Sequence, residues 1–152
     1  MIYLGADHRG FKLKEFLKSY LVQVGHRVLD MGNYHYDKDD DYPDFAVPVA
    51  RKVNEDPENA RGILLCGSGV GIDVAANRFK NVRSVLASSA EQARSSRNDV
   101  DTNILCLGAD FLNEEEARKI VEVWLATPFS GEERHKRRIA KIESFFPPQP
   151  TP

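Results

Sequence analysis

The stretch that decides the fold is GILLCGSGVGIDVAANRF, residues 62–79. It opens with an apolar run that ends at Cys66, continues through glycines that alternate with Ser68 and Val70, and passes at once into a helical pattern. A glycine turn at the start of a helix can grip a phosphate, seat a dinucleotide or hold a charged reaction intermediate. The rest of the chain has to decide between these uses.

The length and composition of the chain indicate a single domain. Its 152 residues, 41% of them hydrophobic, are enough to bury one sizeable core. The 21 basic and 23 acidic residues give a formal net charge of −2, so no global field draws the protein to nucleic acid or anionic lipid. Any anion site must therefore be local.

The two cysteines and the first residues bear on the compartment. Cys66 and Cys106 lie inside apolar runs without metal-ligand spacing, which favours free thiols in a reducing environment over a disulfide or a zinc site. The chain starts with the strand-like MIYLGA, and no apolar run approaches the ~18 residues that a membrane helix needs. We expect a cytoplasmic protein.

Short apolar runs alternate with helical patterns along the chain. Gly25 is expected to end the first helix, and Asn113 to cap the fifth. The expected strands are 2–6, 26–31, 62–66, 82–87 and 103–108, and the expected helices are 12–24, 43–55, one directly after the glycines, 90–97, 113–126 and 132–145.

This alternation predicts an α/β fold in which a five-stranded parallel sheet is covered by helices on both faces, a three-layer α/β/α sandwich. We expect the strand order 2-1-3-4-5, which makes the first and third strands neighbours and opens a crevice at their carboxyl ends. The loops ADHRG (6–10) and CGSGVG (66–71) meet there. Residues 1–146 form the domain, and the proline-rich tail 147–152 is expected to be extended.

The glycine turn does not fit either common nucleotide motif. A dinucleotide site needs G-x-G-x-x-G and an acidic residue about twenty positions later. This turn reads G-S-G-V-G, the next strand ends at Ala87 without a carboxylate, and the lysine of a P-loop is missing. What remains is a group of backbone N–H donors that suits an anionic oxygen.

Cys66 lies at the lip of this turn, where the dipole of the following helix would favour its thiolate. Aldose–ketose isomerisation needs a base beside a carbonyl, N–H donors for the enediolate and a hydroxyl that moves protons between two oxygens. Cys66, the turn backbone and Ser68 would fill these roles in order. Cys106, inside the fifth strand, is expected to be structural. The backbone donors and substrate-binding positions in the turn are Gly67, Gly69 and Gly71.

With both loops in view, the chain resembles the type B ribose-5-phosphate isomerases and the related galactose-6-phosphate isomerase subunits. The resemblance spans nearly the whole chain in the family's order, and CGSGVG with the following AAN is its most specific part. The matching stretches are GADHRGFKLKEFL, DYPDFA, GILLCGSGVGIDVAANRF, DTNIL and ERHKRRIAKI.

The resemblance implies a Rossmann-like fold, no metal or organic cofactor, and a homodimer, often paired into tetramers, whose sites combine residues of two subunits. It identifies Cys66 as the proton-transferring base and puts Ser68, in place of the family's threonine, beside the enediolate. The substrate would be a sugar phosphate, with ribose 5-phosphate and ribulose 5-phosphate as the first candidates.

For the substrate crevice, the resemblance implies that Asp7 and His8 line it and that Arg134 and Arg138 clamp the phosphate, with His135 nearby. The arginine pair is also consistent with local geometry. Arg134 and Arg138 are four residues apart on one helix face, so both guanidinium groups can converge on one phosphate.

The chain departs from the family pattern in two places. The family carries histidine and asparagine before its D-T-N stretch, and the histidine opens the sugar ring; here Asp99 and Val100 stand at those positions. The family also offers an arginine toward phosphate after the fifth strand, where this chain has Asp110. The identity of the sugar is therefore open.

Several hypotheses accommodate the departures. Asp99 takes over ring opening as a weak catalytic base, or the substrate needs no ring opening, as for a tetrose 4-phosphate, or the chain is a non-catalytic binding subunit of a larger assembly. The retained Cys66, Ser68 and glycines argue against the last of these. Outside this class lies a flavodoxin-like module that binds FMN or another nucleotide.

Overall fold

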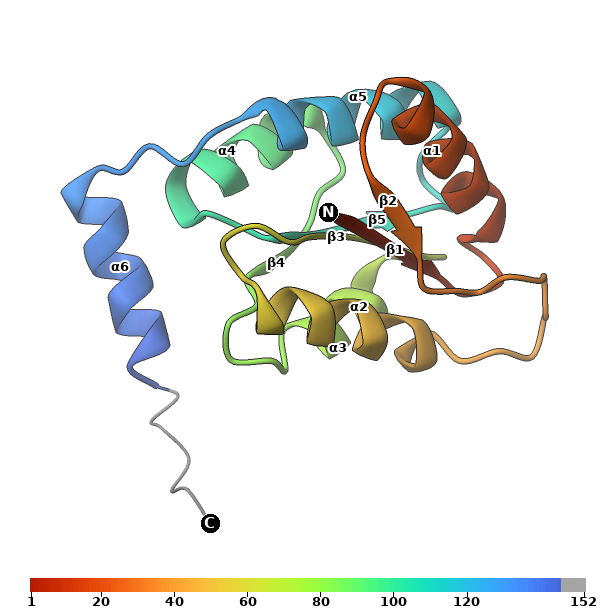
Figure 1. Cartoon of the computed structure of the whole chain (residues 1–152), viewed down its shortest axis with the longest axis horizontal. Coiled ribbons are helices and arrows are strands. Elements are labelled where there is room, and N and C mark those ends of the chain that lie inside the picture. The colour runs from red at the N-terminus through yellow and green to blue at the C-terminus, as the bar shows by residue number, and fades with distance from the viewer. Residues whose placement is uncertain (146–152) are drawn as a thin grey trace, which may run out of the picture.

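The computed structural model describes residues 1–145, and its strands and helices alternate from end to end (Figure 1). Five parallel strands form one sheet, which confirms the predicted fold class. The elements are β1 (Ile2–Ala6), α1 (Phe11–Gln23), β2 (Val28–Asp30), α2 (Pro43–Glu55), β3 (Arg61–Cys66), α3 (Val70–Ala76), β4 (Ser84–Leu86), α4 (Ala90–Val100), β5 (Ile104–Gly108), α5 (Glu114–Ala126) and α6 (Glu133–Glu143).

Each face of the sheet has its own core. Because side chains alternate along a strand, Ile63 and Leu65 point to one face of β3 and Leu64 and Cys66 to the other. The first face is covered by α1, α4 and α5, with Trp124 of α5 fully buried against it. The second is covered by α2 and α3. The result is the expected three-layer sandwich (Figure 1).

The strand order is β2-β1-β3-β5-β4, so the predicted order 2-1-3-4-5 is wrong in its last two strands. β5 lies beside β3, and β4 is the edge strand. The physical reason is burial: all five residues of β5 are buried, whereas the three residues of β4 are only half-buried. The longer, wholly apolar strand occupies the position that is covered on both faces. The pairing of β1 with β3, on which the crevice depends, is as predicted.

Most helix ends follow the local signals. Gly25 has a φ of +94° just after α1, and Asn113 forms a capping box with Glu116 at the start of α5. α4 continues three residues beyond its predicted end, and α6 (Glu133–Glu143) is shorter than the predicted 132–145. Residue 146 of the predicted domain and the tail 147–152 lie outside the described residues.

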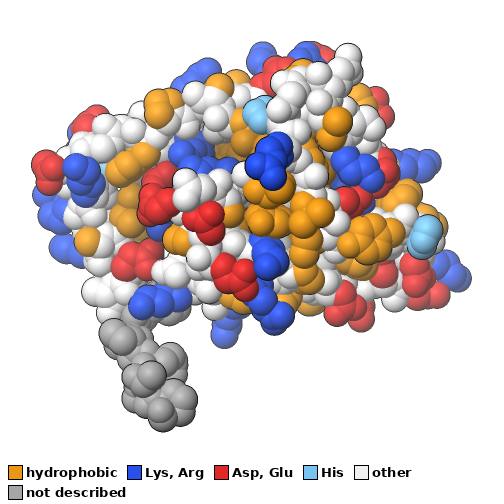
Figure 2. Space-filling model, in the orientation of Figure 1, with side chains coloured by type: hydrophobic (Ala, Val, Ile, Leu, Met, Phe, Trp, Pro, Cys, Tyr) orange, Lys and Arg blue, Asp and Glu red, His pale blue; other side chains and the backbone are white. Residues whose placement is uncertain are grey.

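The surface carries charges of both signs. On the face in Figure 2, basic and acidic side chains are intermixed rather than gathered in a patch of one sign, in line with the nearly balanced sequence. Within residues 1–145, no helix combines the length and the apolar character needed to span a membrane.

Candidate active site

The loops that follow β1 and β3 lie side by side. Ala6 pairs with Leu65 in the sheet register, and the next N–H, that of Asp7, donates to the Leu65 carbonyl at 3.2 Å. Asp7 and Cys66 are therefore neighbours at the carboxyl end of the sheet. The structure thus brings together the predicted residues of both loops.

Cys66 ends β3 with only 4% of its surface exposed. Its sulfur accepts a hydrogen bond from the Gly69 N–H at 3.1 Å. Gly69 can aim its N–H backwards because its φ is +78°, a conformation that L side chains rarely adopt. A Cβ at this position would also lie 2.4 Å from Leu86 Cδ1. The turn requires glycine at this point.

Ser68 and Gly71 have different surroundings: Ser68 faces a hollow, and Gly71 contacts a tyrosine ring. Ser68 is exposed, its hydroxyl oxygen accepts from the Val70 N–H at 3.2 Å, and it lines a hollow of about 490 Å³. Gly71 lies under the ring of Tyr42, and a Cβ there would come within 2.5 Å of the ring. Tyr42, which sequence reasoning did not single out, therefore covers one edge of the turn.

Three backbone donors of the turn remain free. Within the described chain, the N–H groups of Gly67, Ser68 and Gly71 make no hydrogen bond, whereas those of Gly69 and Val70 are used by Cys66 and Ser68. The turn therefore serves the sulfur with one amide and leaves three for an incoming oxygen. The sequence predicted such donors without separating these two tasks.

Asp7 is a buried carboxylate with local partners. Its Oδ1 accepts from the backbone N–H groups of Arg9 at 3.0 Å and Gly10 at 3.1 Å. Burial raises the pKa of Asp7, and the Gly10 bond and the neighbouring His8 oppose that effect. The carboxylate orders the loop after β1.

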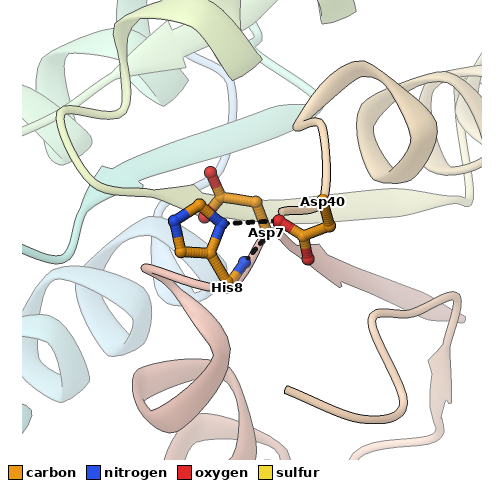
Figure 3. Close-up of side chains that lie close together, drawn as sticks. All are labelled: Asp7, His8 and Asp40. Atoms are coloured by element: carbon orange, nitrogen blue, oxygen red, sulfur yellow. Dashed lines mark hydrogen bonds and ion pairs between the residues drawn. The ribbon is translucent and has the colours of Figure 1, made fainter. Parts of the chain in front are cut away.

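His8 is held by Asp40, which comes from the acidic loop before α2 (Figure 3). The His8 Nδ1 lies 2.6 Å from Asp40 Oδ1, and the His8 backbone N–H donates to the same oxygen at 2.9 Å. Asn33 donates to the other oxygen of Asp40 at 2.6 Å. The bond to Asp40 raises the pKa of His8. The imidazole is therefore fixed through Nδ1 and favours its cationic form.

Asp7, His8 and Asp40 also form the one group of potential metal ligands within residues 1–145, with ligand atoms within 4.8 Å of one another. Their hydrogen bonds explain this clustering: backbone N–H groups satisfy Asp7, and His8 and Asn33 satisfy the two oxygens of Asp40. The donor set fits hydrogen bonding within the loops at least as well as it fits a cation.

The other predicted site residues form a second group at the α4 and α6 end of the chain. Asp99 lies in the last turn of α4 with its side chain 49% exposed, and one of its oxygens lies 3.7 Å from His135 Nε2. His135 is buried, and its Nδ1 lies 2.7 Å from the Ser130 hydroxyl. Arg134 pairs with Glu132, and Arg138 is exposed.

Within one chain, the two groups are separate. Figure 1 shows α6 projecting beside α4, whereas the carboxyl end of β1 runs toward the α1 side. A single chain therefore does not bring Arg134 and Arg138 to Cys66. Among the described residues, no hydrogen bond or ion pair joins the two groups.

Some conspicuous sequence features are structural. The Asn103 side chain accepts from the Arg83 N–H at 2.8 Å and donates to the Asn81 carbonyl, and Thr102 accepts from Trp124. The DTN stretch therefore ties β4, β5 and α5 together. Cys106 is fully buried, burial raises the pKa of its thiol, and its sulfur lies 3.2 Å from the Ser84 hydroxyl, as expected for a structural cysteine.

Sequence reasoning missed Asp40 and Arg9. Asp40 belongs to the run DKDDDY, where nothing distinguishes it from its acidic neighbours. Arg9 forms an ion pair with Asp110 across the crevice mouth. For Arg9, the available signal was one of the two departures, the acidic Asp110 after β5, together with a basic residue in the loop after β1.

Comparison with known proteins shows which proteins this chain is similar to in sequence and fold. Ribose-5-phosphate isomerase B of Mycolicibacterium paratuberculosis is 39% identical over 144 residues, covering 95% of this chain and 90% of the relative. The crystal structure of ribose-5-phosphate isomerase B from Mycoplasma genitalium with bound ribulose-5-phosphate superposes with a TM-score of 0.92 at 40% identity, covering 95% of this chain and 94% of that one.

A second solved structure, ribose-5-phosphate isomerase B of Clostridium thermocellum, has a TM-score of 0.90 and 38% identity, with 95% of each chain covered. The sequence model of the protein family described as Ribose/Galactose Isomerase matches residues 2–142, which is nearly the whole described chain. The chain belongs to the ribose/galactose isomerase family.

Proposed function

We propose that this protein interconverts the aldose and ketose forms of a sugar phosphate, with ribose 5-phosphate and ribulose 5-phosphate as its pair. The observation that carries the proposal is the placement of the Cys66 sulfur at the end of β3, with the Gly69 N–H bonded to it and with the Ser68 hydroxyl and unpaired amides in the same turn. Relatives that are 39% and 38% identical to this chain are named ribose-5-phosphate isomerase B, after the same reaction.

The geometry supports an enediolate mechanism. The Cys66 thiolate, which the Gly69 N–H stabilises, takes the proton from the carbon next to the carbonyl and returns it to the adjacent carbon. The free N–H groups of Gly67 and Ser68 face the negative oxygen that forms in between. The Ser68 hydroxyl moves a proton between the two oxygens. The step needs no external oxidant or reductant, because one carbon is oxidised as its neighbour is reduced.

The second group of residues would complete the site from another copy of the chain. Among the described elements, α6 packs mainly against α4, and its arginines do not reach the crevice of their own chain. In a homodimer, Arg134 and Arg138 would bind the phosphate held in the partner's crevice, with His135 nearby, and Asp99 would face the sugar.

Because Asp99 stands where a ring-opening histidine is expected, the second candidate substrate is a sugar phosphate that forms no ring. An exposed aspartate is a weaker base than the histidine expected for ring opening. A tetrose 4-phosphate cannot close a furanose ring, because its O4 carries the phosphate, so it needs no such group. The tested pair is therefore ribose 5-phosphate against erythrose 4-phosphate.

The experiment is a turnover assay of the purified protein with four-, five- and six-carbon aldose phosphates, repeated with Cys66→Ala and Cys106→Ala. We expect one substrate to be turned over by the parent protein and by Cys106→Ala, and not by Cys66→Ala. Cys106 is the matched control because it is a free, buried thiol on the same face of the sheet. Undiminished turnover by Cys66→Ala would remove the sulfur from the mechanism.

A further inference from the structure

Arg9 lies in the crevice and has no role in the function proposed above. It follows Asp7 and His8 in the loop after β1, and its backbone N–H is fixed by the Asp7 carboxylate at 3.0 Å. Its side chain is 57% exposed, so the guanidinium group is reachable from solvent. A cation at this place faces the same space as the catalytic loops.

The guanidinium group lies directly on the glycine turn. A Cβ built on Gly67 would come 2.6 Å from Arg9 Nε and 2.9 Å from its Cζ, so the guanidinium group rests against the backbone of Gly67. Gly67 is also where Asp110 joins the turn, since the Asp110 N–H donates to the Gly67 carbonyl at 3.0 Å. Arg9, Gly67 and Asp110 therefore meet at one point beside Cys66.

The ion pair with Asp110 uses only part of the guanidinium group. One nitrogen, Nη2, bonds to the Asp110 carboxylate, and within residues 1–145 the Nε and Nη1 atoms have no hydrogen-bond partner. Asp110 thus holds Arg9 beside the turn and leaves the Nε and Nη1 donors of the guanidinium group available to a ligand. A planar guanidinium fixed in this way is suited to phosphate oxygens.

The charges of the crevice call for such a cation. Asp7, Asp40 and Asp110 all lie around the loops, and a phosphate dianion would meet their repulsion. Lys14, the nearest buried amine on α1, is fully used by Asp30 and the Asn33 carbonyl. Arg9 retains unused donors.

We propose that Arg9, positioned by Asp110, binds the phosphate group of the substrate from the same chain that supplies Cys66. The inference rests on the proposed function, because it assumes a phosphorylated sugar in this crevice. It gives Asp110 a role as the positioning residue for Arg9.

The competing explanation is that Arg9 only neutralises Asp110. The two explanations separate in a double variant. If Arg9 only neutralises Asp110, Arg9→Ala leaves an uncompensated carboxylate that repels phosphate, and removing that carboxylate in Arg9→Ala/Asp110→Asn restores binding. If Arg9 binds phosphate itself, the double variant stays as weak as Arg9→Ala.

The experiment measures KM for the substrate and, by calorimetry, the Kd of inorganic phosphate. We expect Arg9→Ala to weaken both by roughly 10- to 100-fold, the range for losing hydrogen bonds to a charged group. Arg9→Lys should recover part of the lost affinity, because lysine keeps the positive charge but lacks the paired N–H donors of the guanidinium group. The matched control is Arg94→Ala, which removes an exposed arginine that is likewise paired with one carboxylate, that of Glu91 on α4.

Unchanged phosphate affinity in a folded Arg9→Ala protein, or full recovery in the double variant, would overturn the inference. Circular dichroism and thermal unfolding establish that each variant is folded. The calorimetric arm does not depend on turnover. If the protein has no isomerase activity but its phosphate binding depends on Arg9, the result counts against the proposed function alone. If the protein turns over substrate but its phosphate binding does not depend on Arg9, the result counts against this inference alone.

Discussion

Two histidine–aspartate pairs lie in different regions of the chain, and they are built differently. In the crevice, His8 Nδ1 is 2.6 Å from Asp40, whose other oxygen is held by Asn33. At the α4 and α6 end, His135 Nε2 is 3.7 Å from Asp99, and its Nδ1 faces Ser130 instead. The first pair belongs to a closed polar network, whereas the second leaves an exposed carboxylate.

The difference separates what one chain completes from what it leaves open. The crevice has the proposed base, its backbone donors and a fixed histidine within one chain. The other region has exposed arginines on α6, of which Arg134 pairs only with the neighbouring Glu132. We infer that the first region does the chemistry and that the second presents charge to a partner.

The largest expected effect comes from removing the charge of the second region. Arg134→Ala/Arg138→Ala should lower kcat/KM by roughly 10²- to 10⁴-fold, as expected for two lost contacts to a charged group, while thermal stability stays close to that of the parent. Steady-state kinetics and a melting curve measure both. Mixing this inactive variant with Cys66→Ala should restore turnover, because a mixed dimer regains one intact site.

Failure of the mixed protein to recover activity, with subunit exchange verified by mass spectrometry, would place both groups in one chain's site and break the comparison.

The next effect concerns the backbone donor on the crevice side. Gly69→Ala should cost more than about 1 kcal/mol of unfolding free energy and lower kcat by at least roughly tenfold, since the residue is forced into a left-handed conformation and the N–H bonded to sulfur moves. Gly25→Ala is the matched control, because Gly25 has a φ of +94° and nothing within 4 Å of an added Cβ. Equal kinetic effects in the two variants would show that the Gly69 amide has no special role.

A smaller effect tests the exposed carboxylate of the second region. Asp99→His should raise turnover of ribose 5-phosphate by up to about tenfold if ring opening limits the rate, because histidine is the better acid–base catalyst near neutral pH. Turnover of erythrose 4-phosphate, which forms no furanose, is the internal control and should not rise. An equal gain on both substrates would point to a general effect on the site.

The smallest expected effect is a change in the pKa of His8. The bond to Asp40 raises the pKa of His8, so its contribution to stability is fully present below about pH 6.5 and is lost as the pH rises through the folded pKa. Asp40→Asn should lower the pKa of His8 and remove this dependence. NMR of the His8 imidazole resonances measures the shift. A His8 pKa that does not move in the variant would contradict the assigned cause.

The sequence predicts the fold well because its signals are local. The apolar run before Cys66, the glycines after it and the cap at Asn113 each act within a few residues, and their elements are found as expected. The order of β4 and β5 failed because it depends on which strand is better covered by distant helices.

The site was only partly predictable for the same reason. Asp40 meets His8 across 32 residues, and Arg9 meets Asp110 across 101, so neither pair leaves a local pattern. The left-handed turn at Gly69 was predictable as a glycine requirement. Its use, an N–H aimed at the sulfur of Cys66, became visible only in three dimensions.

The most direct test of the account is exchange of substrate hydrogen with solvent. Proton NMR in D₂O follows the hydrogen on C2 of the aldose phosphate while the protein is present. The account predicts that the parent protein and Cys106→Ala replace this hydrogen with deuterium or transfer it into product, and that folded Cys66→Ala does neither. Continued loss of the C2 hydrogen in Cys66→Ala at the parent rate would contradict a mechanism in which this sulfur is the base.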